Sequence, residues 1–113
     1  MVKKGGKGVK VFIAGKVTGT TDYIERFEKM EKELEELGLE VVNPVKETRR
    51  LGVNAPWVEY MRITVPLLCT CDAIYLMNGW TDSNGATLER YVADGLGLLL
   101  MLEPTSRERI RNS

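Results

Sequence analysis

Histidine is absent from the sequence. That absence excludes a Ser-His-Asp triad, a histidine general base and any zinc site built on imidazole ligands. Any chemistry must therefore use carboxylates, hydroxyls, lysines or the two cysteines. We expect neither a metal ion nor a cofactor.

Cysteine is scarce, with only Cys69 and Cys71 in the segment Cys-Thr-Cys-Asp. Two thiols without further soft ligands make a poor zinc site. Two interpretations remain open: a redox pair, or two buried free thiols at the entry to a core strand, which is the more common case. The composition fits a reducing compartment, so we expect a cytoplasmic protein.

The chain also lacks an excess of either charge, with 16 basic and 16 acidic residues. This balance argues against a general binder of nucleic-acid polymers or membrane surfaces, but leaves room for a local phosphate pocket. No apolar run approaches the roughly 18 residues that a membrane span needs. The 113 residues predict one domain at 9–103, between a flexible leader at 1–8 and a polar tail at 104–113.

Short apolar segments alternate with amphipathic ones along the chain. The apolar segments predict strands at 9–14, 39–42, 72–77 and 98–102. The amphipathic segments predict helices at 22–37, from 56 to about 68, and at 86–96, with Pro66 expected to kink or divide the second. Residues 45–55 look irregular. This β-α-β-α-β-α-β order predicts a small doubly wound α/β domain, whose parallel sheet has strand order 2-1-3-4 and is covered on both faces.

The first predicted helix has the clearest local signals. Asp22 followed by Glu25 resembles a capping box, and Gly38 is a typical terminating glycine. Apolar residues recur at spacings of three and four and should share one buried face: Tyr23, Phe27, Met30, Leu34 and Leu37.

Topology predicts where a ligand would bind. Doubly wound sheets bind ligands outside the carboxyl ends of their strands, at the point where the strand order reverses. Here that point lies between the first and third strands, so the loops 15–21 and 78–85 should meet there. These loops are also the segments richest in glycine and hydroxyl residues. We therefore expect a nucleotide or nucleoside pocket between them.

The loop 15–21 joins a strand to a helix N-terminus, where free amides and the helix dipole favour a phosphate. Lys16 would add charge, and the hydroxyls of Thr18, Thr20 and Thr21 would add donors. The segment lacks the Gly-Lys-Ser/Thr ending of a Walker loop. A plain capped turn is an equally good interpretation of this loop by itself.

Three acidic residues and one tryptophan are candidates around the second loop. Glu89 near the start of the last helix should be kept ionised by the helix dipole and could serve as a nucleophile, a base or a sugar-hydroxyl acceptor. Its alternative role is helix stabilisation alone. Trp80 could stack on a nucleobase or pack against the following helix. Asp82 on the loop and Asp72 at the start of the third strand are candidates for proton transfer, and Asp72 is otherwise a plain strand-end carboxylate.

Several of these segments together resemble the nucleoside 2-deoxyribosyltransferase superfamily. The resemblance covers about residues 9–101 and is to a phage-rich branch without assigned function, and to the 2′-deoxynucleoside 5′-monophosphate N-hydrolases. It is carried by Phe12-Ile13-Ala14-Gly15, Thr18-Gly19, Asn43-Pro44, Cys71 to Leu76, Gly79-Trp80, Ser83-Asn84-Gly85-Ala86 and Glu89.

The resemblance implies a Rossmann-like (flavodoxin-like) three-layer fold, a homodimer or higher homo-oligomer, and cleavage of an N-glycosidic bond. A glutamate matching Glu89 attacks the anomeric carbon of the sugar. The candidate substrate and phosphate-binding residues are Gly15, Lys16, Thr18, Gly19, Gly79, Trp80, Ser83, Asn84 and Gly85. Three positions depart from the family pattern: Thr64 replaces an aspartate that assists the leaving base, Ser83 replaces the aspartate of the transferases, and Phe12 replaces a hydrolase tyrosine.

Three hypotheses follow. The first is an N-glycosidic-bond hydrolase or transferase that acts on a nucleoside or nucleoside 5′-monophosphate, with Glu89 as nucleophile and Asp82 or Asp72 handling protons. The second is a non-catalytic nucleotide binder, which the substitution at Thr64 favours. The third is an interaction domain whose pocket is vestigial.

Overall fold

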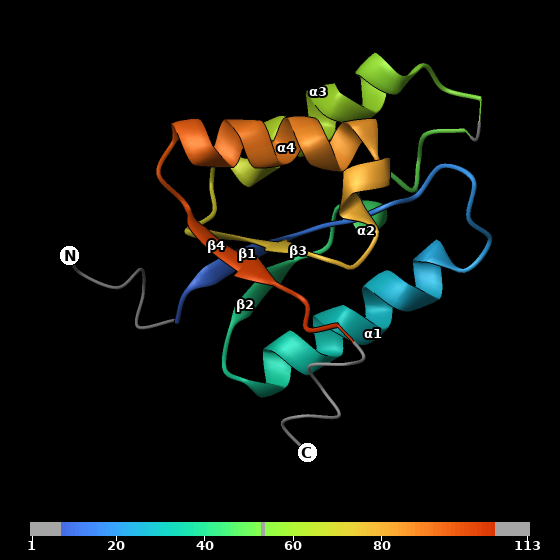
Figure 1. Cartoon of the computed structure of the whole chain (residues 1–113). Helices are drawn as coiled ribbons and strands as arrows, with labels where there is room; N and C mark the ends of the chain where they lie inside the picture. The colour runs from blue at the N-terminus through green and yellow to red at the C-terminus, as the bar shows by residue number, and fades with distance from the viewer. Residues whose placement is uncertain (1–7, 53, 106–113) are drawn as a thin grey trace.

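The computed structural model describes residues 8–52 and 54–105, and it has a four-stranded parallel sheet. The strands are β1 (Lys10–Ala14), β2 (Glu40–Val42), β3 (Ala73–Leu76) and β4 (Leu99–Leu102), in the order β2-β1-β3-β4 (Figure 1). The predicted strand order and α/β class are therefore confirmed. Most of the predicted leader, and the tail from residue 106, lie outside the described residues.

Helices cover the two faces of the sheet. In Figure 1, α1 (Tyr23–Glu36) lies on one face, and α3 (Trp57–Leu68) and α4 (Asn84–Gly95) lie on the other. A short helix, α2 (Pro44–Glu47), follows β2, and a 3-10 turn, η2 (Trp80–Asp82), precedes α4. The result is three layers, as predicted.

Two buried clusters fill the spaces between these layers, because successive strand residues point to opposite faces. Val11 and Ile13 of β1 pack with Phe27, Met30 and Leu34 of α1. On the other face, Phe12 and Ala14 pack with Leu68 of α3 and with Ala86 and Ala93 of α4. Both clusters run to the carboxyl end of β1, where a helical layer stands on either side.

The first helix differs from the prediction at both ends. The Asp22 side chain makes no cap hydrogen bond and instead accepts one from Nε of Arg26 at 3.1 Å, so the capping box does not form. Leu37 was expected on the buried face but is 74% exposed. The apolar spacing continues one residue beyond the helix, and Gly38, with φ +88°, turns the chain away there.

The segment after β2 was expected to be irregular, and it begins with α2 instead. Asn43 starts this helix because its side-chain oxygen accepts a hydrogen bond from Val45 N at 3.0 Å. Pro44 takes the first helical position, where its missing N–H has no cost. Pro66 does not divide α3, which continues to Leu68, since the proline lies in the last turn.

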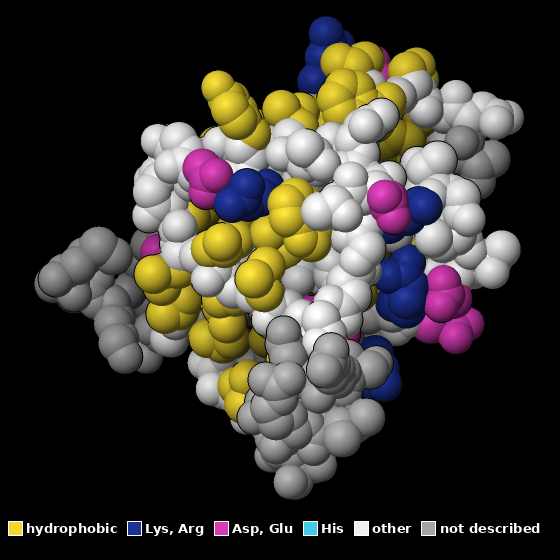
Figure 2. All heavy atoms as spheres, in the orientation of Figure 1, with side chains coloured by type: hydrophobic (Ala, Val, Ile, Leu, Met, Phe, Trp, Pro, Cys, Tyr) yellow, Lys and Arg dark blue, Asp and Glu magenta, His cyan; other side chains and the backbone are white. Residues whose placement is uncertain are grey.

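The helical cover of the sheet is incomplete at β4. This strand forms one edge of the sheet, and Leu99, Leu100 and Leu102 are 59%, 45% and 59% exposed. Figure 2 shows hydrophobic side chains gathered over α4 and β4. We call this the α4–β4 surface: Tyr91, Leu96, Leu99, Leu100 and Leu102.

The two cysteines differ in environment. Cys71 is buried beside the second cluster and Cys69 is exposed, so only one of the two predicted buried thiols is buried. Cys69 directly follows the last residue of α3. Among the described helices, none is long and apolar enough to cross a membrane.

Candidate functional site

A cavity of about 730 Å³ lies at the carboxyl end of β1, between the two helical layers. This volume is within the usual range for small-molecule sites. Both predicted loops contribute to its wall, since Gly15, Thr18 and Gly19 line it from one side and Ser83 and Gly85 from the other. The switch point between β1 and β3 therefore does bring these two segments to one cavity.

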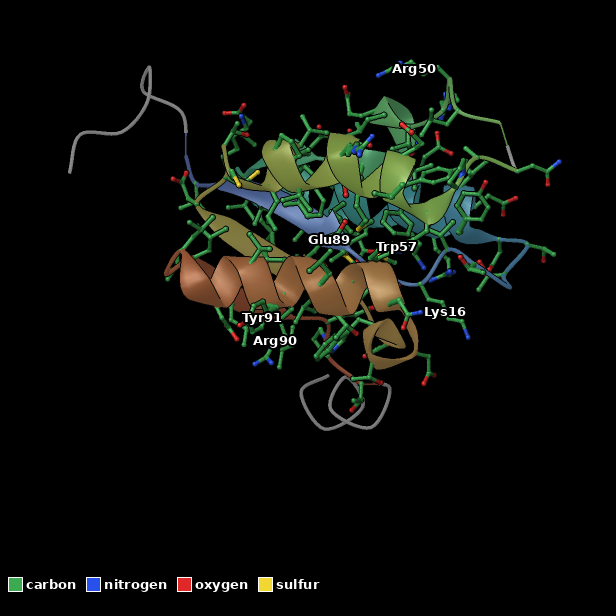
Figure 3. The ribbon with its side chains drawn as sticks, turned by 90° about the horizontal axis from the view of Figure 1, so that it is seen from above. Lys16, Arg50, Trp57, Glu89, Arg90 and Tyr91 are labelled. Carbon is green, nitrogen blue, oxygen red and sulfur yellow. The ribbon has the colours of Figure 1, made fainter. Side chains whose placement is uncertain are left out.

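Glu89 is the one acidic residue among the described residues that line this cavity. Its side chain lies between α3 and α4 (Figure 3), and the residue is only 5% exposed. Burial raises its pKa from 4.5 to about 7, because the charged form loses its hydration. The helix dipole was expected to keep Glu89 ionised near neutral pH, but a carboxyl group with a pKa of about 7 is only partly ionised there. Glu89 lies past the first turn of α4, where the dipole is weak.

Thr64 of α3 lines the same cavity and lies next to Glu89. Its hydroxyl lowers the pKa of Glu89, but this effect is smaller than that of burial. The two groups do not form a hydrogen bond of good geometry, because Thr64 Oγ1 is buried without a hydrogen-bond partner in the described part of the protein. The cavity therefore holds a carboxyl group and an unsatisfied hydroxyl side by side.

Trp57, not Trp80, is the tryptophan of the cavity. Trp57 starts α3 and is 51% exposed, with Tyr60 one turn further along the cavity wall. Trp80 packs against the second buried cluster, and the Arg90 guanidinium lies 5.4 Å from its ring centroid. The signal that could have identified Trp57 is topological: a helix that follows β2 begins at the carboxyl edge of the sheet.

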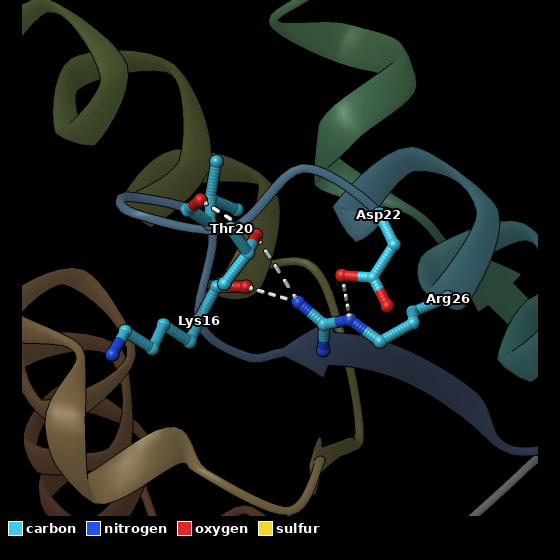
Figure 4. A network of polar contacts seen from close by, with 5 residues as sticks. Lys16, Thr20, Asp22 and Arg26 are labelled. Atoms are coloured by element: carbon cyan, nitrogen blue, oxygen red, sulfur yellow. Dashed lines mark hydrogen bonds and ion pairs between the residues drawn. The ribbon is translucent and has the colours of Figure 1, made fainter.

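The β1–α1 loop is held by Arg26. Its Nη2 donates to the Lys16 carbonyl at 2.8 Å and to Thr20 Oγ1 at 3.4 Å, and its Nε contacts Asp22 (Figure 4). Thr20 also donates to the Val17 carbonyl at 2.8 Å. Lys16 and Thr20 thus shape the loop through these contacts, and neither residue is part of the cavity lining.

Two glycines allow close approach in this cavity. A Cβ at Gly15 would lie 3.2 Å from Met77 Cβ and 3.3 Å from Phe27 Cζ, so the loop packs directly on the core. A Cβ at Gly85 would lie 3.1 Å from Met61 Cε. Ser83 caps α4 by accepting a hydrogen bond from Ala86 N at 3.1 Å, which leaves its hydroxyl proton available.

The remaining predicted site residues lie outside the cavity lining. Asp82 is exposed on η2, Asn84 starts α4, and Gly79 (φ +90°) begins the 3-10 turn. Asp72 lies before β3 at the opposite edge of the sheet, where its Oδ2 accepts a hydrogen bond from Lys10 N at 2.9 Å. The structure therefore does not bring Asp72 to the site.

The segment after β2 supplies a wall that the sequence did not predict. Thr48, Arg49 and Leu51 all line the cavity. Arg49 is the one lysine or arginine among the described lining residues, so it takes the place predicted for Lys16. Within residues 8–52 and 54–105, no three acidic or cysteine side chains are grouped so that they could hold a metal ion.

The fold and site together define a small doubly wound α/β domain with a buried acid at its switch point. Within that class the chain belongs to the family DUF4406, a domain of unknown function, whose family model matches residues 9–102. No curated protein matches the sequence. The family match covers β1 to β4 and so includes every segment that lines the cavity.

Proposed function

We propose that this protein cleaves the N-glycosidic bond of a nucleoside or nucleoside 5′-monophosphate, as a hydrolase or a transferase. The observation that carries the proposal is Glu89, a buried carboxyl group in a cavity of about 730 Å³ at the switch point of the sheet. A buried acid in such a cavity is a common sign of a functional site. The family-like segments around Glu89 favour this chemistry over other uses of an acid.

The proposed reaction has two steps. The Glu89 carboxylate attacks C1′ of the sugar, the C1′–N bond breaks, and its electron pair leaves with the base, which takes a proton from solvent. Water or a second base then attacks C1′ of the glycosyl ester, the bond between C1′ and the Glu89 oxygen breaks to restore the carboxylate, and the attacking group loses a proton to solvent. Only the ionised form of Glu89 can attack, so turnover should rise with pH through about 7.

The cavity offers groups for each part of such a substrate. Trp57 and Tyr60 present aromatic faces on which a base could stack. Backbone amides of the loop around Thr18, the Ser83 hydroxyl and the Arg49 guanidinium are donors for a phosphate. Lys16, Asp72 and Asp82 have no part in this arrangement, because they are not among the lining residues.

Chromatography for free base tests the proposal. The full chain is incubated with a panel of nucleosides and 5′-monophosphates beside Glu89→Gln, Glu89→Ala and a control, Glu36→Gln, at an exposed helix position. We expect base release from the native chain and the control, and a loss of roughly 1,000-fold or more in both Glu89 variants. Full turnover by Glu89→Gln would contradict the mechanism.

A non-catalytic nucleotide binder is the second candidate, and one observation favours it. The described lining residues include a single acid, whereas the resemblance implies two, with Thr64 at the position of the second. Tight binding by calorimetry without base release during a long incubation would select this function. If no nucleotide raises the melting temperature, the pocket is vestigial, since a ligand that binds only the native state must stabilise it.

The proposal includes self-association. The α4–β4 surface exposes five large apolar side chains next to a sheet edge that pairs with no further described strand, and a second copy of the chain could cover it. Its function on small nucleotides would place the protein in the cytoplasm, where Cys69 and Cys71 would stay reduced.

A further inference from the structure

Thr64 of α3 has a buried hydroxyl at the wall of the cavity. The residue is 5% exposed and lines the cavity, and Oγ1 has no hydrogen-bond partner among the described residues. An unpaired buried hydroxyl destabilises a protein, and nearly all such groups have partners in folded proteins. The threonine therefore has an unfilled hydrogen-bonding capacity, and it belongs to a residue that lines the cavity.

Other polar side chains of the cavity differ from Thr64 in this respect. The Thr48 hydroxyl donates to the Pro44 carbonyl at 2.9 Å, and Tyr60 Oη donates to the Gly52 carbonyl at 2.9 Å. Ser83 Oγ accepts a hydrogen bond from Ala86 N. Thr64 is thus the lining residue whose buried polar atom has no partner of good geometry among the described residues, so a ligand atom that reaches it would supply that partner.

The position of Thr64 beside Glu89 indicates which ligand atom it would meet. In a β-nucleoside the base leaves from one face of the sugar, so a nucleophile must reach C1′ from the opposite face. The 2′-hydroxyl of ribose is on that same opposite face, on the carbon next to C1′. A side chain immediately beside the nucleophile therefore lies next to the 2′-hydroxyl.

We propose that Thr64 is a specificity-determining residue whose hydroxyl hydrogen-bonds the ribose 2′-hydroxyl, so that the site prefers ribonucleosides or ribonucleotides over their 2′-deoxy forms. This inference rests on the proposed function, because the argument needs a sugar held against Glu89. It opposes the deoxyribose preference that the family resemblance would imply. A deoxyribose leaves the Thr64 hydroxyl unpaired, and a site with a buried unpaired group discriminates against such a ligand.

Paired substrates measure the preference. The full native chain, Thr64→Val, Thr64→Ser and Thr70→Val are compared on the four ribonucleoside 5′-monophosphates and their 2′-deoxy forms. Two readouts are taken: kcat/KM for base release, and Kd by calorimetry. Valine keeps the shape of threonine without the hydroxyl, serine keeps the hydroxyl, and Thr70 is an exposed threonine outside the cavity lining.

For the native chain we expect a ribose preference of roughly tenfold or more in Kd or kcat/KM for the base that is accepted. Thr64→Val should reduce that ratio to about one, whereas Thr64→Ser and Thr70→Val should keep it. Equal treatment of both sugars by the native chain, a deoxyribose preference, or an unchanged ratio in Thr64→Val would overturn the inference.

The two readouts separate this inference from the proposed reaction. A Thr64-dependent ribose preference in Kd without base release would overturn the glycosidase and support the inference. Base release without a sugar preference would do the reverse. Failure of every nucleotide to bind would overturn both.

Discussion

Asn43 donates a hydrogen bond from its side-chain amide to the carboxylate of Glu31, and the Nδ2–Oε1 distance is 3.1 Å. Both residues are buried, and Lys46 Nζ lies 2.9 Å from the other carboxylate oxygen. The contact joins the start of α2 to the middle of α1. Because Pro44 and Val45 of α2 line the cavity, this pair fixes one wall of the candidate site.

Asn43→Ala should destabilise the protein by roughly 2 kcal/mol or more, since it removes the cap of α2 and leaves Glu31 with one partner fewer. Lys46→Met should have a smaller effect, because the lysine side chain is half exposed and its ion pair is screened by solvent. Urea unfolding of the three proteins at neutral pH measures both changes. Equal destabilisation by the two substitutions would show that the buried amide has no special role.

Stability should depend on pH through Glu89. A carboxyl group whose pKa rises from 4.5 in the unfolded chain to about 7 in the folded protein binds more protons when folded. Its stabilising contribution is therefore present below about pH 4.5 and is lost as pH rises to about 7. The shift corresponds to roughly 3 kcal/mol.

Glu89→Gln removes this titration, so the difference in stability between the variant and the native chain measures the contribution of Glu89. As the pH rises from about 4.5 to about 8, the free energy of unfolding of the variant should increase by roughly 3 kcal/mol relative to that of the native chain. The reason is that the buried Glu89 ionises over this range in the native chain, whereas glutamine does not ionise. Chemical unfolding at both pH values gives the difference. A constant difference between the two proteins across this range would show that Glu89 has an ordinary pKa.

Trp57→Ala should weaken nucleotide binding by roughly tenfold or more, the loss expected for one base-stacking contact. The tryptophan is 51% exposed, so the variant should remain folded. Tyr91→Ala, which removes an exposed aromatic ring of the α4–β4 surface, is the matched control and should bind as the native chain does. Calorimetry with the nucleotide that the native chain binds measures the Kd of each protein. An unchanged Kd in Trp57→Ala would show that Trp57 does not contact the ligand.

Self-association should depend on the edge strand. Light scattering of the native chain should give the mass of a dimer or a larger oligomer, and Leu99→Lys with Leu102→Lys should lower it to that of one chain. Charged residues on an exposed edge oppose pairing with another copy. A native chain that is monomeric at all concentrations would contradict the proposed oligomer.

Much of the fold could be predicted because its signals are local. Apolar runs bounded by glycine and proline located all four strands, and the strand order then placed the loop at Gly15 and the helix with Glu89 near one another. The same topology could have excluded Asp72. A residue that precedes a parallel strand lies at the edge opposite to the ligand.

The missed features depend on contacts between distant segments. The pKa of Glu89 is set mainly by its burial between α4 and α3. Its neighbour Thr64 lies 25 residues earlier in the chain, so no local sequence pattern connects the two residues. Trp57 and Trp80 both lie next to loops, and Trp80 is drawn away from the cavity by its packing against the second buried cluster and Arg90. Leu37 continues the apolar spacing of its helix, and the terminating Gly38 places the helix end only to within a residue, so the spacing alone put Leu37 on the buried face.

The cavity has one further consequence, because its walls belong to both helical layers. Tyr23 of α1 stands on one side of the sheet, and Thr64 and Glu89 of α3 and α4 stand on the other. A ligand that contacts all three would tie the layers together across the sheet edge and resist their separation. Hydrogen exchange should then slow on binding even at backbone amides of α1 and α4 that no ligand touches. Ligand occupancy of the cavity could therefore be measured from the rate at which the whole domain opens.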